Sequence, residues 1–137
     1  MQLSLTPPSA AEFKTLYDET GWGDRSLADF ESALASTWLF CTARDPDGLL
    51  TGMGRLISDG VLHAFVTELI VREGSLGHGV GAQILGRLVG EARARGVEDV
   101  QLFAASGRAA FYERNGFTRR PERAPGMDAV ATGVRPA

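Results

Sequence analysis

The chain has 137 residues, 44% of them hydrophobic and 23% charged, and its formal net charge at pH 7 is −3. These values predict one globular domain spanning residues 1–137 and exclude a general affinity for nucleic acid. No apolar run is long enough for a membrane span, and the N-terminus lacks the basic start and apolar block of a signal peptide. We therefore expect a cytoplasmic protein that binds neither nucleic acid nor a membrane.

Cysteine and histidine usage narrows the chemistry further. The one cysteine, Cys41, excludes an intrachain disulfide and suits a reducing compartment. Its neighbours are apolar, which predicts a buried strand residue and not a nucleophile. The only histidines are His63 and His78, and there is no Cys/His cluster. The sequence therefore predicts no metal site built from soft ligands.

In chain order, a short strand at Gln2–Leu5 precedes two helices that serines are placed to cap. Ser9 and Ser26 each stand before a stretch with apolar residues at helical spacing. The glycines of Gly21–Asp24 separate the two helices. Two interpretations of Trp22 stay open, a substrate-side aromatic and a packed loop anchor.

Three further strands follow as an antiparallel meander. We expect them at Thr37–Thr42, Leu49–Ser58 and Val61–Val71, because Asp47-Gly48 and Asp59-Gly60 are strong hairpin signals between apolar runs. The middle strand contains two glycines, at positions 52 and 54, which permit a bulge or a close approach of another backbone.

A glycine-rich turn leads from the fourth strand into an amphipathic helix. Gly77, Gly79 and Gly81 fall where the turn becomes the helix, and Gly96 ends it. Without a Cβ, these glycines let the backbone come close to a ligand. The amides of His78–Ala82 would be unpaired donors at the positive end of the helix dipole. Such a turn is a site for phosphate.

The glycines alone do not identify the ligand. One alternative is a helix that simply begins with glycines. Another is a dinucleotide site, since residues 77–82 satisfy G-x-G-x-x-A. In dinucleotide folds, however, the glycines follow the strand almost at once, and here Arg72–Leu76 intervenes.

The last third of the chain completes an α+β fold. We expect a fifth strand at Glu98–Ala104, a helix at Arg108–Asn115, a strand starting at Phe117–Arg119, a loop at Arg120–Gly126 and a last strand at Ala129–Thr132. The fourth and fifth strands should be parallel, because a crossover containing a helix joins them. The result is a single mixed, mostly antiparallel sheet flanked by helices.

Two motifs carry a resemblance to a known family. With Gly79-Val80-Gly81 and with the run FYERNGF at Phe111–Phe117, the chain resembles the GCN5-related N-acetyltransferases (GNAT superfamily) over almost its whole length. The turn of that family reads Q/R-x-x-G-x-G/A, and Leu76 departs from its first position. The segments Arg55–Gly60 and Pro125–Met127 are similar to a small-domain subgroup that includes plant serotonin N-acetyltransferases.

The resemblance implies a GNAT fold in which the fourth and fifth strands splay, and a direct transfer of acetyl from acetyl-CoA to a primary amine of a small molecule or a protein. From the same resemblance we also expect a homodimer. Tyr112 would protonate the departing thiolate, although a packed helix aromatic is the alternative. Arg114 would reach a coenzyme phosphate or remain a solvated charge. The other coenzyme-binding residues would be Leu69, Ile70 and Val71 for the pantetheine arm, and Leu76, Gly77, His78, Gly79, Val80, Gly81 and Ala82 for the pyrophosphate.

Two charged residues interrupt apolar strands. Glu68 is the one acid inside VTELIV, so it must face solvent, a partner or a site. It is a candidate general base, acting directly or through water. Arg55 suits either a substrate carboxylate or a structural ion pair. A second function stays open, a non-catalytic acyl-CoA-binding module: Leu76 favours it, and Tyr112 favours the enzyme.

Overall fold

The computed structural model describes residues 1–130 and divides into two compact units, residues 1–102 and a second unit that begins at Phe103. Each unit is described by itself, and the prediction of one domain over the whole chain stays a prediction. In the described part of the chain, no helix is both long enough and apolar enough to cross a membrane.

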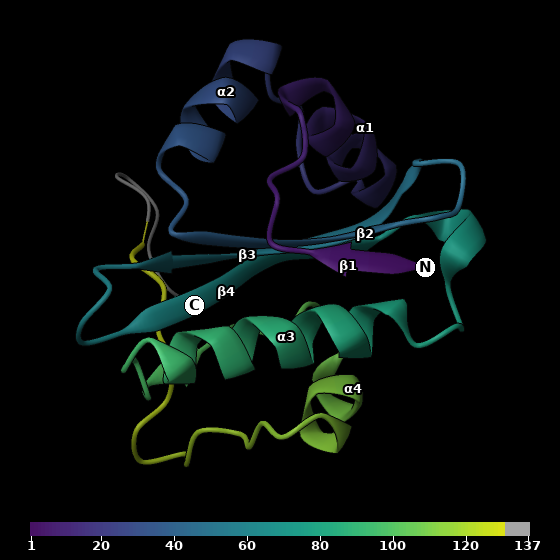
Figure 1. Cartoon of the computed structure of the whole chain (residues 1–137). Helices are drawn as coiled ribbons and strands as arrows, with labels where there is room; N and C mark the ends of the chain where they lie inside the picture. Colours follow the sequence, from purple (N-terminus) through teal and green to yellow (C-terminus); the bar gives the residue numbers. More distant parts are fainter. Residues whose placement is uncertain (131–137) are drawn as a thin grey trace. The chain divides into compact units, whose positions relative to one another are not determined.

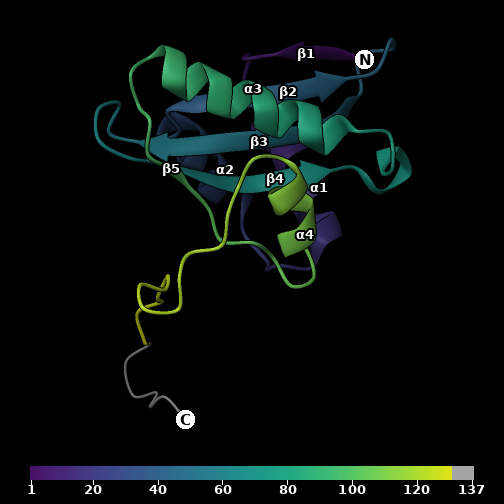
Figure 2. The ribbon, with the colours of Figure 1, turned by 90° about the horizontal axis from the view of Figure 1, so that it is seen from below.

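The first unit is built on a five-stranded sheet with the strand order β1-β2-β3-β4-β5 (Figure 2). The first four strands pair antiparallel, and β4 pairs with β5 in parallel. This confirms the predicted mixed, mostly antiparallel sheet. The strands are β1 (Gln2–Ser4), β2 (Leu39–Arg44), β3 (Leu50–Ser58), β4 (Ala64–Val71) and β5 (Val100–Gln101).

Several predicted strand bounds were wrong. Strand β5 has two residues where Glu98–Ala104 was expected, and Phe117–Arg119 is not a strand. Residues 129 and 130 are not in a strand either, and the rest of that predicted strand lies outside the described residues. Strand β4 begins late because Asp59 Oδ1 accepts hydrogen bonds from the amides of residues 61–63, which holds them in a turn.

Two helices of the first unit are capped as the sequence predicts. They are α1 (Ala10–Thr20) and α2 (Leu27–Ala35). Ser9 and Ser26 each form a capping box, in which the serine hydroxyl accepts from a first-turn amide and an acidic side chain accepts from the serine amide. These local pairs satisfy amides that would otherwise have no acceptor.

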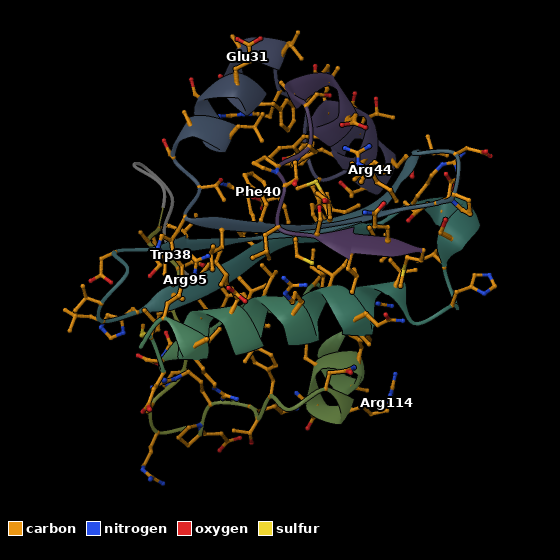
Figure 3. All side chains as sticks on the ribbon, in the orientation of Figure 1. Glu31, Trp38, Phe40, Arg44, Arg95 and Arg114 are labelled. Atoms are coloured by element: carbon orange, nitrogen blue, oxygen red, sulfur yellow. The ribbon has the colours of Figure 1, made fainter. Side chains whose placement is uncertain are left out.

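Helices cover both faces of the sheet (Figure 1). Helices α1 and α2 lie on one face, and the long helix α3 (Val80–Ala94) lies on the other. Figure 3 shows Phe40 pointing from β2 toward α1 and α2. The buried cluster on this face consists of Phe13, Leu16, Phe30, Phe40, Leu50, Met53 and Ile70.

Helix α3 packs closely on β3 because two strand residues have no side chain. A Cβ on Gly52 would lie 2.9 Å from Ile84 Cδ1, and one on Gly54 would lie 2.9 Å from Leu88 Cδ1. The sequence left open a bulge or a close approach of another backbone at these glycines. The structure has side chains of α3 close to both of them, and the pairing of β3 with β4 changes register at Gly54. Cys41 pairs with Gly54 and is fully buried, as predicted. Burial raises the pKa of its thiol to about 11.

An ion pair ties α1 to the end of β2. Glu12 accepts two hydrogen bonds from Arg44, at 2.6 Å and 2.9 Å, and also belongs to the capping box of α1. Figure 3 shows Arg44 beside the sheet below α1. The Arg44 guanidinium lowers the pKa of the Glu12 carboxyl from 4.5 to about 2.

Glu12→Gln should therefore lower stability in a pH-dependent way. Gln still completes the capping box, so the change isolates the charge paired with Arg44. A lowered folded-state pKa stabilises above the unfolded value and loses its effect as pH falls toward the folded value. Urea unfolding should show a loss of about 1 kcal/mol at neutral pH, limited by solvent screening, and almost none at about pH 2.

Glu31→Gln is the matched control, because Glu31 is an exposed carboxylate of α2 (Figure 3). It should change stability little at either pH. An equal loss for Glu12→Gln at both pH values would show that the charge is not what stabilises α1.

Candidate functional site

A β-bulge interrupts the pairing of β3 with β4. Met53 pairs with Ile70 and Arg55 pairs with Thr67, so Gly54 lies opposite two residues, Glu68 and Leu69. Glu68 has a φ of +42° and is the one left-handed residue other than glycine in the described chain. At this position of a bulge, glycine is the usual residue, because a Cβ makes the left-handed conformation costly.

The bulge decides which face Glu68 occupies. In a strand with regular alternation, the Glu68 side chain would point to the face opposite Thr67, toward α3 and its apolar residues. Instead, Glu68 Oε1 accepts a hydrogen bond from Arg55 Nε at 2.7 Å, and Oε2 accepts one from the Thr67 hydroxyl. The bulge therefore lets a carboxylate in an apolar strand meet its charged partner.

Arg55 reaches from this pair to the α1–α2 layer. Its Nη1 donates to Thr37 Oγ1 at 2.8 Å and to the Ala33 carbonyl at 3.4 Å, and its guanidinium lies 5.8 Å from the centre of the Phe13 ring. The side chains of Arg55 and Glu68 are 12% and 21% exposed. Of the two sequence interpretations of Arg55, the structure has the ion pair.

Beyond the bulge, one edge of β4 is open within the first unit. Its described residues pair with β5 only at Ala64 and Phe65. Ile70 is buried in the core, and Leu69 packs against the Gly54 position. These side chains are occupied by packing, so the backbone amides and carbonyls at residues 69–71 are what this edge offers a ligand.

The loop between β4 and α3 exposes its backbone. After a short 3₁₀ helix at Glu73–Ser75, Leu76 is exposed, and Gly77 and Gly79 have φ values of +83° and +75°. A Cβ at either glycine would have no described atom within 4 Å. The glycines are therefore required by backbone conformation and leave the space above them open.

The start of α3 differs from the starts of α1 and α2. Gly79 is its N-cap and supplies no side-chain hydrogen bond, and the first turn contains no acidic residue. The amides of Val80–Ala82 thus remain donors at the positive end of a 15-residue helix. Uncapped amides of this kind favour an anion, and the phosphate site expected from the sequence stays a prediction.

The second unit contains the FYERNGF segment as helix α4 (Ala109–Arg114) and the turn after it. The ring of Tyr112 lies 5.1 Å from that of Phe111 and 6.0 Å from that of Phe117. Burial raises the pKa of the Tyr112 hydroxyl above its usual value of 10.0, and Arg108 partly offsets this effect. The hydroxyl therefore keeps its proton at neutral pH. Arg114 is exposed in the last turn.

Some features of the site had no signal in the sequence. The roles of Thr37 and Thr67 depend on the bulge, which follows from strand register and not from local composition. Trp22 is half-exposed and lies edge-on to Tyr17 at 6.1 Å, which leaves both of its interpretations open. Among residues 1–130, no group of three or more Cys, His, Asp or Glu side chains is arranged to hold a metal ion.

Within the first unit, these features define an α+β fold in which an open strand edge is followed by a helix start with uncapped backbone amides. The family model of the acetyltransferase (GNAT) domain matches residues 36–119, which is more than half of the chain. The chain therefore belongs to the GNAT family, and this membership supports acetyltransferase activity in general.

Two curated relatives extend the comparison. An uncharacterised N-acetyltransferase of Pyropia yezoensis is 26% identical over 119 residues, covering 85% of this chain and 68% of the relative. A protein of Oryza sativa subsp. japonica named serotonin N-acetyltransferase 2, chloroplastic, is 32% identical over 90 residues. That match covers 66% of this chain and 45% of the rice protein, so the chain spans about half of that relative's length.

Solved structures agree on the fold. A protein of Mycobacterium tuberculosis in complex with coenzyme A matches with a TM-score of 0.73 at 24% identity. The match covers 96% of this chain and 77% of that protein.

Proposed function

We propose that this chain transfers an acetyl group from acetyl-CoA to a primary amine, on a small molecule or on a protein, by direct attack. The observation that carries the proposal is the start of α3. Two left-handed glycines precede amides that no side chain caps, whereas α1 and α2 satisfy theirs with serines of their own. A diphosphate of coenzyme A is an anion of the kind such amides bind.

The described residues fit the coenzyme. Residues 76–82 would hold its pyrophosphate through backbone amides, so the departure of Leu76 from the family motif removes one side chain and leaves the amides in place. The open edge of β4 at residues 69–71 would pair with the amide groups of the pantetheine arm, as an added strand does. Arg114 is the proposed partner of a further phosphate. When bound, the thioester supplies the acetyl group.

Proton transfer assigns roles to two residues. Tyr112 would protonate the departing thiolate, because its hydroxyl carries a proton at neutral pH. Glu68, directly or through water, would take the proton of the attacking amine. Its carboxylate already accepts hydrogen bonds from Arg55 and Thr67, so water is the natural relay. Positioning both reactants contributes much of the remaining acceleration.

Release of free thiol from acetyl-CoA in the presence of a panel of amines tests the function. Amine-dependent release is expected, with an acetylated product of matching mass. The alternative is a non-catalytic module that binds acyl-CoA, which the departure at Leu76 favours. Binding of coenzyme A without turnover of any amine would support that module instead. The proposal also includes a homodimer, which light scattering tests. It includes a cytoplasmic location too, although the rice relative is named as chloroplastic.

Coenzyme A should raise the melting temperature, and Gly81→Leu should remove most of that increase. A ligand at about 100 times its Kd stabilises the native state by about 2.7 kcal/mol, which corresponds to several degrees. Gly81 lies in the first turn of α3, and helical side chains lean toward the N-terminus, so Leu would cover the open amides. Differential scanning fluorimetry measures the shift.

Gly86→Leu is the matched control, since Gly86 lies in the middle of the same helix and a Cβ there would meet no atom of the described residues within 4 Å. It should keep the full shift. Equal shifts for both variants would place the phosphates elsewhere, and a clear shift with NADH would revive the dinucleotide alternative.

Tyr112→Phe should lower kcat by about 10²-fold with little change in KM. The change removes only a hydroxyl and keeps the ring contacts with Phe111 and Phe117, and the hydroxyl acts on the leaving group in the transition state. Steady-state kinetics with a slow amine, whose chemistry limits turnover, measures the effect. An unchanged kcat would leave Tyr112 as a packing residue.

Glu68→Gln separates the two proton transfers. Gln keeps an oxygen that can accept from Arg55 but is not a base, so the acidic limb of the pH–rate profile should weaken. The effect should shrink for amines that are already unprotonated at the assay pH. If the profile stays in place, proton removal belongs to water or to another acid.

A further inference from the structure

Arg55 connects the β4 bulge to the opposite layer of the first unit. One side of its guanidinium binds the Glu68 carboxylate, and the other binds the Thr37 hydroxyl and the Ala33 carbonyl at the end of α2. The ring of Phe13 lies near the guanidinium carbon. The guanidinium is therefore fixed from several directions, and it fixes what it binds.

Glu68, the residue that Arg55 binds, has a left-handed backbone conformation that has to be stabilised by its surroundings. Glu68 is left-handed, and residues other than glycine stay in that region only where the surroundings determine it. Thr67 also binds the carboxylate, but it is the preceding residue in the chain and would move with the bulge. Arg55 lies on the neighbouring strand, opposite Thr67, so its hold is external to β4.

We propose that Arg55 is a positioning residue: it holds Glu68 in the left-handed bulge and thereby sets the direction of the β4 backbone at residues 69–71. This inference rests on the proposed role of that edge in coenzyme binding. A strand that lost its bulge would shift by one residue relative to β3, and each following amide would point to the opposite side. Arg55 would thus act on coenzyme affinity without contacting the coenzyme.

Two double variants test this role. Arg55→Met removes the hold but also leaves the Glu68 carboxylate without its partner. Adding Glu68→Gly or Glu68→Ala removes that carboxylate equally, and the two additions differ in one respect. Glycine adopts the left-handed region freely, and alanine does not.

Coenzyme A affinity, measured by isothermal titration calorimetry, is the first readout. Arg55→Met should weaken binding about tenfold, the factor that corresponds to the cost of a left-handed residue that is no longer held. Arg55→Met/Glu68→Gly should restore binding to near the parent value, and Arg55→Met/Glu68→Ala should not. Equal affinities for the two double variants, or parent-like binding by Arg55→Met, would overturn the proposal.

The kcat provides a separate readout. The glycine double variant lacks the carboxylate, so under the proposed function it should regain coenzyme affinity without regaining kcat. A merely structural Arg55 would move stability in all these variants but would not separate glycine from alanine in affinity.

Backbone chemical shifts at residues 67–71 test the role without any ligand. They should indicate a left-handed residue 68 in the parent and in the glycine double variant, and an extended one in the alanine double variant. If the parent binds no coenzyme A, the proposed function fails, and the chemical shifts still decide the role of Arg55. If Arg55→Met does not fold, Arg55→Lys replaces it, because Lys lacks the planar fork that reaches both Glu68 and Thr37.

Discussion

The bulge at Glu68 is the constraint from which the candidate site follows. It places an acidic side chain on the α1–α2 face, beside Arg55, and keeps it out of the apolar layer under α3. Bulges also bend the strand that contains them and often end its pairing. Among the described strands of the first unit, β5 pairs with β4 only before the bulge, and no strand pairs with that edge after it. One inserted residue therefore accounts for the position of the carboxylate, and the unpaired stretch of β4 lies just beyond it.

In the first unit, helices α1 and α2 are capped by residues near in sequence, and contacts between residues distant in sequence fix the helices to the sheet. Helices α1 and α2 begin with capping boxes made by neighbours in sequence, and the Glu12–Arg44 pair then fixes α1 to the sheet. Helix α3 has no such cap, and it is held by apolar packing over Gly52 and Gly54. Packing can hold a helix without consuming the amides at its start. The helix whose end is proposed to bind a ligand is thus the one anchored along its length.

The sequence predicted most strongly those features that depend on near neighbours. The two serine caps and the two hairpins follow from short motifs, whereas the packing of α3 side chains over Gly52 and Gly54 depends on the sheet. The length of β5 could not be predicted in this way, because VQLFA is a good strand pattern whose pairing depends on the edge of β4. The same holds for residues 61–63, where the Asp59 side chain captures apolar residues that look like a strand.

Glu68 illustrates the limit most clearly. Its presence in an apolar strand marked it as unusual, but regular alternation would have placed it on the wrong face. Its actual face depends on register against β3, and its partner Arg55 is thirteen positions away in the sequence. The distinction between a solvated acid, a base and an ion pair could therefore not be made without the sheet. The roles of Tyr112 and Arg114 in the second unit are proposals as well, because they depend on contacts with residues far away in the sequence.

The burial of Cys41 has a practical consequence. This thiol lies opposite Gly54, which packs against α3, and it is both shielded and, with a pKa of about 11, almost wholly un-ionised at neutral pH. An alkylating reagent can therefore modify it only when the protein opens, either locally around the packing of α3 on the sheet or by global unfolding. The rate at which Cys41 is alkylated therefore reports how often the protein opens, and no label has to be introduced. A ligand bound at the start of α3 would lower the rate of Cys41 alkylation, because it stabilises the closed state.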